Sequence, residues 1–161
     1  MRKKQWIIPA IAIILLCYIF RTQPLSEKIH LTETDSDLEV CLIRSNPVEQ
    51  DDGSILYEHL VYEFRETLDS EAGQTLLNAM AEIPCRLRFR LPFENVTVYS
   101  TGQDSFSVSF TIDRKPIEFV WLSDSSTMYG LGGSHQTFRL PNESFAALAA
   151  IVEEYGTLRK E

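Results

Sequence analysis

The chain has 161 residues, 44% of them hydrophobic and 11% aromatic, which is enough for one folded domain and short for two. Its formal net charge is −8, and residues 29–161 hold 22 of the 23 acidic side chains but only 10 of the 15 basic ones. Phosphate backbones repel such an acidic domain, so we expect no nucleic-acid partner.

The amino-terminal segment joins a basic head to an uncharged apolar run, Trp6–Phe20, with Arg21 on its far side. We interpret residues 6–22 as a transmembrane signal anchor, residues 1–5 as its cytoplasmic head, and the membrane as a partner through this helix. The run spans only ~22 Å of a ~30 Å bilayer core, which also suits a signal peptide. No small-residue cleavage pair follows, which favours an uncleaved single-pass anchor in the cell membrane with the remaining chain extracytoplasmic.

Lipidation is the alternative to this anchor, because Leu15-Leu16-Cys17 resembles the lipobox of bacterial lipoproteins. Leu16 is bulkier than the small residue that the lipobox has before its cysteine, and the apolar run continues beyond Cys17. We therefore favour Cys17 as an ordinary apolar helix residue.

The chain after the anchor divides into a polar stem (residues 23–37), a domain (residues 38–156) and a charged tail (residues 157–161). The domain begins with a β-rich run, Leu38–Ile43, followed by an acidic loop over residues 48–54. Ile55–Thr67 has apolar residues at both helical and strand spacings. Its tyrosine, valine and phenylalanine content favours a strand.

Two helices are predicted inside the domain. The first, Ser70–Ile83, has a cap at Asp69 or Ser70 and is stopped by Pro84. The second begins near Asn142, a good N-cap residue. Both carry one apolar stripe, so each is expected to pack against a sheet.

The segments between these helices alternate apolar and polar residues with the period of a strand. The predicted strands are Cys85–Leu91, Asn95–Ser100, Ser105–Asp113, Ile117–Leu122 and His135–Leu140. The glycine-rich residues 130–134 lack the spacing of a phosphate-binding loop, so we interpret them as a hairpin connection. The predicted fold class is α+β, a mostly antiparallel meander with two helices on one face, in the order β-β-α-β-β-β-β-β-α after the N-terminal transmembrane helix.

The strongest candidate binding site is a row of arginines on the polar face of one predicted strand: Arg86, Arg88 and Arg90. Guanidinium groups at this spacing suit a carboxylate, a phosphate or an anionic glycan. The competing interpretation is ordinary cross-strand pairing with acidic neighbours such as Glu94, Asp113 or Glu118.

Other chemistry has little support in the sequence. Cys41 and Cys85 lie in predicted strands and are either joined by a disulfide or remain buried thiols. Histidines and cysteines do not fall at zinc-ligand spacing, so we predict no metal site and no cofactor. The motifs of common serine hydrolases and metalloproteases are missing from the sequence, so no catalytic residues are predicted.

The anchor, the strand-rich middle and Thr137-Phe138-Arg139-Leu140 before the last helix resemble a small domain of unknown function from Gram-positive bacteria. Proteins with this domain are signal-anchored or lipoprotein-like, and the similarity covers roughly residues 38–156. The resemblance implies an extracytoplasmic location and supplies no catalytic residues.

We therefore expect a membrane-anchored, non-catalytic, extracytoplasmic domain that binds a protein partner in the cell envelope or an anionic ligand. One alternative is a cell-envelope hydrolase or transferase whose site is assembled from distant residues. Another is a structural subunit of a membrane complex.

Overall fold

One antiparallel sheet forms the centre of the structure, a computed structural model that describes residues 7–31, 37–89, 102–132 and 136–159. Within those ranges nine strands pair in the order β1-β4-β8-β7-β6-β5-β2-β3-β9. The strands are β1 (Gln23–Pro24), β2 (Leu38–Glu49), β3 (Ile55–Glu66), β4 (Pro84–Arg88), β5 (Ser105–Ile112), β6 (Lys115–Leu122), β7 (Thr127–Gly132), β8 (Thr137–Arg139) and β9 (Thr157–Arg159).

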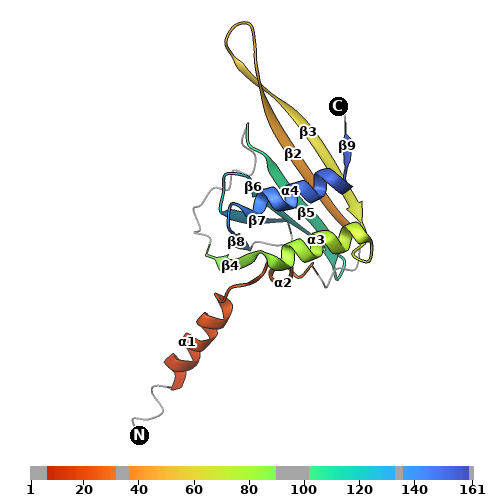
Figure 1. The fold of residues 1–161 in the computed structure, drawn as a ribbon. Coiled ribbons are helices and arrows are strands. Elements are labelled where there is room, and N and C mark those ends of the chain that lie inside the picture. The colour runs from red at the N-terminus through yellow and green to blue at the C-terminus, as the bar shows by residue number, and fades with distance from the viewer. Residues whose placement is uncertain (1–6, 32–36, 90–101, 133–135, 160–161) are drawn as a thin grey trace.

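Two helices, α3 and α4, lie side by side across one face of this sheet (Figure 1). The helices are α1 (Ile7–Ile19), α2 (Leu25–Lys28), α3 (Glu71–Glu82) and α4 (Ser144–Tyr155). The core lies between the sheet and the helices, where Trp121 meets Phe145 edge-on at 5.4 Å between ring centroids. The structure is thus α+β and mostly antiparallel, as the alternation of apolar residues predicted.

The predicted transmembrane helix is wrong. Helix α1 covers 13 residues, about 20 Å at ~1.5 Å per residue, whereas a bilayer core is ~30 Å thick. Within the described ranges, no helix combines the length and the apolar character that a membrane crossing requires. The span over residues 6–22, the single-pass topology, the membrane as a partner and the localisation derived from them are corrected accordingly. Helix α1 projects from the body with none of its side chains buried (Figure 1).

The predicted stem and tail belong to the fold. Gln23 and Pro24 pair with β4, and the apolar side chains that follow are inserted into the core: Leu25, Ile29 and Leu31. At the other end, Thr157–Arg159 forms β9 against β3. The domain therefore begins before Leu38 and includes part of the charged tail. The sequence did not indicate this at the stem, because its few apolar residues are surrounded by polar ones and are buried only by packing under α3.

Local signals at the two large helices had different outcomes. Ser70 caps α3 as predicted, and its Oγ accepts a hydrogen bond from Gly73 N at 3.0 Å. Asn142 does not cap α4, which begins after Glu143 without a side-chain cap. After α4, a Cβ on Gly156 would lie 2.4 Å from Val152 O, so this close approach requires glycine where the chain turns into β9.

Most predicted strands are present with shifted ends. Ile55–Glu66 is a strand, which confirms the preference for a strand over a helix. The segment predicted as a glycine-rich turn is partly strand β7, with Gly130 opposite Phe119. The predicted strand Asn95–Ser100 lies outside the described residues. Phe89, predicted on the buried face, is 71% exposed and contacts only the ring of Phe20 among the described aromatic residues, at 4.7 Å between centroids.

Candidate functional site

The most distinctive surface feature is the outer half of the β2–β3 hairpin, residues 44–60, which we call the arm. Strand β5 pairs with β2 only over Glu39–Ile43, and β9 pairs with β3 only over Val61–Glu63. Within the described residues, the arm strands therefore pair only with each other. Six residue pairs at ~3.3 Å per residue extend the arm about 20 Å beyond the sheet. Figure 1 shows it projecting from the body.

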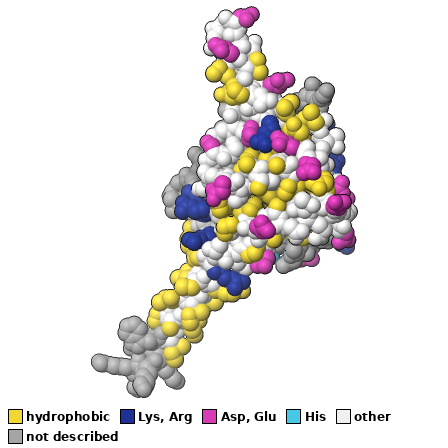
Figure 2. Space-filling model, in the orientation of Figure 1, with side chains coloured by type: hydrophobic (Ala, Val, Ile, Leu, Met, Phe, Trp, Pro, Cys, Tyr) yellow, Lys and Arg dark blue, Asp and Glu magenta, His cyan; other side chains and the backbone are white. Residues whose placement is uncertain are grey.

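Large apolar side chains of the arm are exposed to solvent. Leu56 is 58% exposed and Ile55 is 57% exposed. Val48 and Tyr57 are also exposed, but to a smaller extent. Successive residues of a strand point to opposite faces, so Leu56 shares one face with Val48, and Ile55 shares the other with Tyr57. Figure 2 shows apolar and acidic side chains together on the arm. Exposed apolar residues gathered on one element indicate a contact surface.

The base of the arm is fixed to the body by a set of charged contacts. Arg44 Nη1 lies 2.7 Å from Asp104 Oδ2, and Arg44 Nε donates to Glu153 Oε1 on α4 at 2.7 Å. The hydrogen bond to Glu153 is the main reason that the pKa of Arg44 is raised above its ordinary value. Asp104 also accepts from Ser45 N at 2.8 Å. These bonds hold the arm in one direction relative to α4.

A close approach of two residues completes the base. The ring of Tyr57 lies over Gly102, where an added Cβ would be 2.5 Å from Tyr57 Cζ. Gly102 also has φ of +94°, a conformation that favours glycine. At the opposite end the tip is closed by Gln50 N donating to Ser54 O at 2.8 Å. The arm is therefore an ordered hairpin with a braced base.

Ser45 and His59 also meet at this base, and their geometry does not make a nucleophile. Ser45 Oγ lies 3.2 Å from His59 Nδ1 and donates its proton to Gln103 O at 2.9 Å. A hydroxyl has one proton, so Ser45 must accept from His59, the reverse of the relation between a serine nucleophile and its base. The two carboxylate oxygens of Asp104 accept from Arg44 Nη1 and Ser45 N, so Asp104 does not orient the imidazole.

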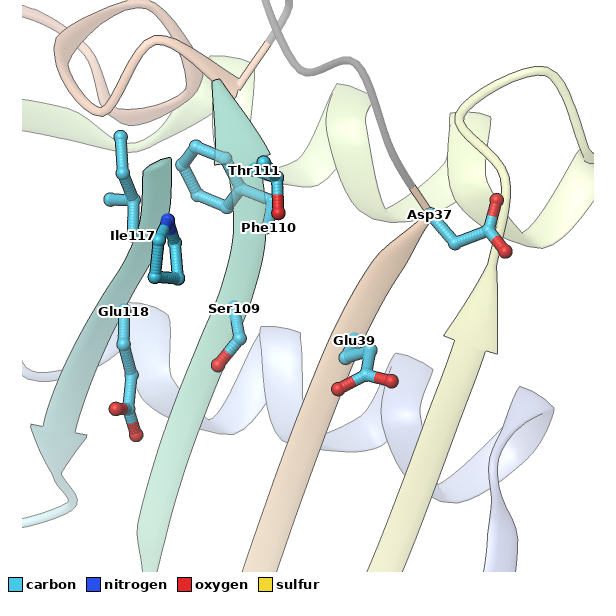
Figure 3. Close-up of a pocket in the computed structure, with 8 residues that line it drawn as sticks. Asp37, Glu39, Ser109, Phe110, Thr111, Ile117 and Glu118 are labelled. Carbon is cyan, nitrogen blue, oxygen red and sulfur yellow. The ribbon is translucent and has the colours of Figure 1, made fainter. Parts of the chain in front are cut away.

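The sheet face away from the helices carries a pocket of about 430 Å³ at the inner end of β2. Glu39, Ser109 and Glu118 lie directly opposite one another on β2, β5 and β6, so Ser109 stands between two carboxylates (Figure 3). Asp37, Thr111 and Pro116 also line it. The lining accepts hydrogen bonds and attracts cations, but it contains no histidine that could serve as a base.

The carboxylates that line the pocket are not grouped as metal ligands. In the part of the chain that the structure describes, no three or more His, Cys, Asp or Glu side chains are placed to hold a metal ion. Glu39 is drawn toward Arg65, whose Nε lies 3.6 Å from Glu39 Oε1. Both side chains are largely exposed, so this pair adds little stability.

Arg86 and Arg88 of the predicted arginine row lie on β4, next to β1 and β8. Arg86 Nε donates to Thr22 Oγ1 at 2.8 Å, Arg88 is half-buried, and Arg90 lies outside the described residues. Of the acidic partners considered from the sequence, Glu118 lies on β6 and Asp113 in the turn before it, neither of which is next to β4, and Glu94 lies outside the described residues. Arg86 instead lies directly opposite Arg139 on β8. Sequence reasoning missed Arg139, because only the pairing of β4 with β8 brings the two together.

Cys41 and Cys85 are both free thiols. Four strands separate β2 from β4 in the sheet, which puts the two cysteines roughly 24 Å apart, well beyond the ~7 Å between Cα atoms that a disulfide allows. Burial raises the pKa of the Cys85 thiol to about 12 and also raises that of Cys41, which faces Glu63. Neither cysteine has the depressed pKa of a reactive thiolate.

Comparison with known proteins adds no family to these observations: no family model, curated protein or solved structure matches the chain. The resemblance to a domain of Gram-positive bacteria therefore stays a prediction.

Proposed function

We propose that the protein is a non-catalytic protein-binding domain and that the arm is its recognition element. The observation that carries this proposal is the exposure of Ile55 and Leu56, each more than half accessible on an ordered, braced hairpin. Burying such side chains against a partner gains about 25 cal/mol per Å² of apolar surface. In the isolated chain these exposed side chains contribute little burial free energy to the fold.

The arrangement of polar groups favours binding over catalysis. The site of a hydrolase or transferase would join a nucleophile, a base and an orienting group within hydrogen-bond reach. Among the described residues, the pocket at Ser109 has carboxylates and no histidine, and the Ser45–His59 pair has the wrong donor direction. The arm is the better supported site.

Photo-crosslinking in the cells that produce the protein tests this function. A benzophenone amino acid at position 56 is expected to give one discrete adduct with another protein, whereas the same probe at Glu82, exposed at the end of α3, is expected to give none. Adding Ile55→Asp to the position-56 probe is expected to remove the adduct, because a carboxylate would enter an apolar contact. Adducts at position 82 with none at position 56 would contradict the proposal.

A second candidate function, anion binding, rests on the direct opposition of Arg86 and Arg139. Like charges facing each other across two strands repel, and a bound anion would relieve that repulsion. Inorganic phosphate is expected to shift the amide resonances of β4 and β8 in the native protein and not in Arg86→Gln with Arg139→Gln. Arg65→Gln, a change on the distant strand β3, is the matched control and is expected to keep the response.

A further inference from the structure

The outer edge of β3 along the arm has main-chain groups available for another strand. Ser45 N donates to Asp104, so the Ser45–His59 pair does not exchange main-chain hydrogen bonds across the hairpin. Such pairs alternate with hydrogen-bonded pairs along an antiparallel ladder. By this alternation, His59, Tyr57 and Ile55 direct their N–H and C=O groups away from β2, toward an edge where no strand is paired among the described residues.

The two edges of the arm are not equivalent. On β2, Pro47 has no N–H and the N–H of Ser45 is already taken by Asp104. The β3 edge, Ile55–Leu60, contains no proline and no lysine, the residues that commonly prevent strands from pairing at an edge. Isoleucine and tyrosine in this segment also favour extended structure. Strand addition is therefore expected at β3 and not at β2.

The charge of the arm indicates the partner. The arm contains four carboxylates (Glu49, Asp51, Asp52 and Glu58) and one basic residue, Arg44, whose charge is paired with Asp104 and Glu153 of the body. The acidity at the tip is fixed structurally, since hydrogen bonds from Ser54 lower the pKa of Asp52. A second copy would bring the same four carboxylates, and the whole chain has a net charge of −8, so self-association through the arm is disfavoured.

We infer that a different protein adds one β-strand to the open edge of β3, and that this strand alternates basic residues with other side chains. The basic residues would face Glu58 and the acidic tip on the side of Leu56, and the apolar residues, on the opposite side, would cover Ile55 and Tyr57. This inference rests on the proposed function of the arm and specifies its mode and partner. Main-chain hydrogen bonds supply affinity, and the charges supply selectivity.

Two synthetic nine-residue peptides test the inference on the full chain, one alternating lysine with valine and one with glutamate in place of lysine. The lysine peptide is expected to bind about tenfold tighter or more. It is also expected to slow amide hydrogen exchange at Ile55, Tyr57 and His59. Glu58→Lys is expected to reduce this preference. Equal binding of the two peptides, binding without protection of the three amides, or no binding at millimolar peptide would overturn strand addition.

A matched pair of variants isolates the main-chain contribution. Ile55→Pro and Ile55→Ala both remove the apolar side chain, but only proline removes the N–H directed to the open edge. The proline is tolerable because it stands at the first residue of the strand, at a position that does not bond β2. The lysine peptide is expected to bind Ile55→Ala and to lose at least about tenfold affinity for Ile55→Pro. Equal affinity for both would contradict a strand paired at this edge.

Two further outcomes separate this inference from its alternatives. Sedimentation of the native protein as a dimer that Ile55→Pro converts to a monomer would assign the edge to a second copy and overturn the inference. A crosslink at position 56 without peptide protection would leave the arm as a protein-binding element and reject strand addition. The absence of any protein adduct from the probe at position 56 would instead reject the proposed function.

Discussion

The inner and outer halves of the β2–β3 hairpin belong to the same two strands and lie in opposite environments. In the inner half, Leu42 and Phe64 are at most 1% exposed, lying under α4 with β5 and β9 on either side. In the outer half, Leu56 and Ile55 are more than half exposed, although they belong to the same two strands and the same ladder. Only the inner half is flanked by other described elements.

This difference separates residues that stabilise the fold from residues available for contact. An apolar side chain of the inner half gains free energy in every folded molecule. An apolar side chain of the outer half gains this free energy only when a partner covers it. Burial in the fold therefore does not account for the apolar residues of the arm, whereas the proposed binding function does.

Phe64→Ala is the largest expected perturbation of this comparison. Removing a fully buried ring from the core is expected to lower the free energy of unfolding by about 3–5 kcal/mol, through lost burial and a residual cavity. Leu56→Ala, on the exposed arm, is expected to change it by less than about 0.5 kcal/mol. Urea denaturation followed by tryptophan fluorescence measures both, and a large loss in Leu56→Ala would show that the arm is part of the core.

The strands of this hairpin could be predicted from sequence, but their different environments could not. Alternation and β-forming residues predicted both strands, since these signals reflect local side-chain direction. These signals are the same at Leu42 and at Leu56. Whether each position is covered depends instead on how far β5 and β9 extend along the hairpin. Residues 48–54 were predicted as a loop, whereas Val48 and Glu49 are paired strand residues of the arm.

The same limit applies to the candidate sites. The period of Cys85–Leu91 correctly predicted a strand, and Arg86 is exposed on it. Arg86 lies opposite Arg139 because β4 and β8 are neighbours in the sheet. The two residues are 53 positions apart in the sequence, too far for a local pattern to predict the pairing. The burial of Leu25 and Ile29 likewise depends on a place under α3 that forms only in the assembled fold. The separation of Cys41 from Cys85 follows from the strand order for the same reason.

Alkaline titration of Cys85 tests how closed the body of the domain is, in contrast to the exposed arm. Burial raises the pKa of Cys85 from the ordinary 9.0 to about 12, so the folded state holds this proton more tightly than the unfolded state. Its contribution to stability is complete below pH ~9 and is lost as pH rises toward ~12, by about 1.4 kcal/mol per unit. The difference in unfolding free energy between the native protein and Cys85→Ala should therefore shrink over this window, and a constant difference would contradict a closed body.

A pair of glycine substitutions measures how firmly the arm is held. Gly102→Ala and Gly53→Ala both place a side chain at positive φ, +94° and +78°, which costs about 1 kcal/mol in either case. Only at Gly102 would the new Cβ meet the Tyr57 ring, whereas nothing lies within 4 Å at Gly53. The extra loss in Gly102→Ala, measured by urea denaturation, reports the contact of Tyr57 with the body. Equal losses would mean that the ring moves aside without cost.

Arg44→Gln is expected to have a small effect on stability and a clear effect on the arm. Its contacts with Asp104 and Glu153 involve partly exposed charges, so their loss should lower the free energy of unfolding by about 1 kcal/mol or less. The same change removes the link between the arm and α4, so amide exchange should accelerate at Leu56, Glu58 and Leu60, which bond β2, and stay unchanged at Val61–Glu63, where β9 still pairs. Arg65→Gln, which removes only the long contact to Glu39, controls for loss of one positive charge and should leave both segments unaffected. Equal acceleration in both segments would mean that the hairpin opens as a single unit and that its two halves are not independent.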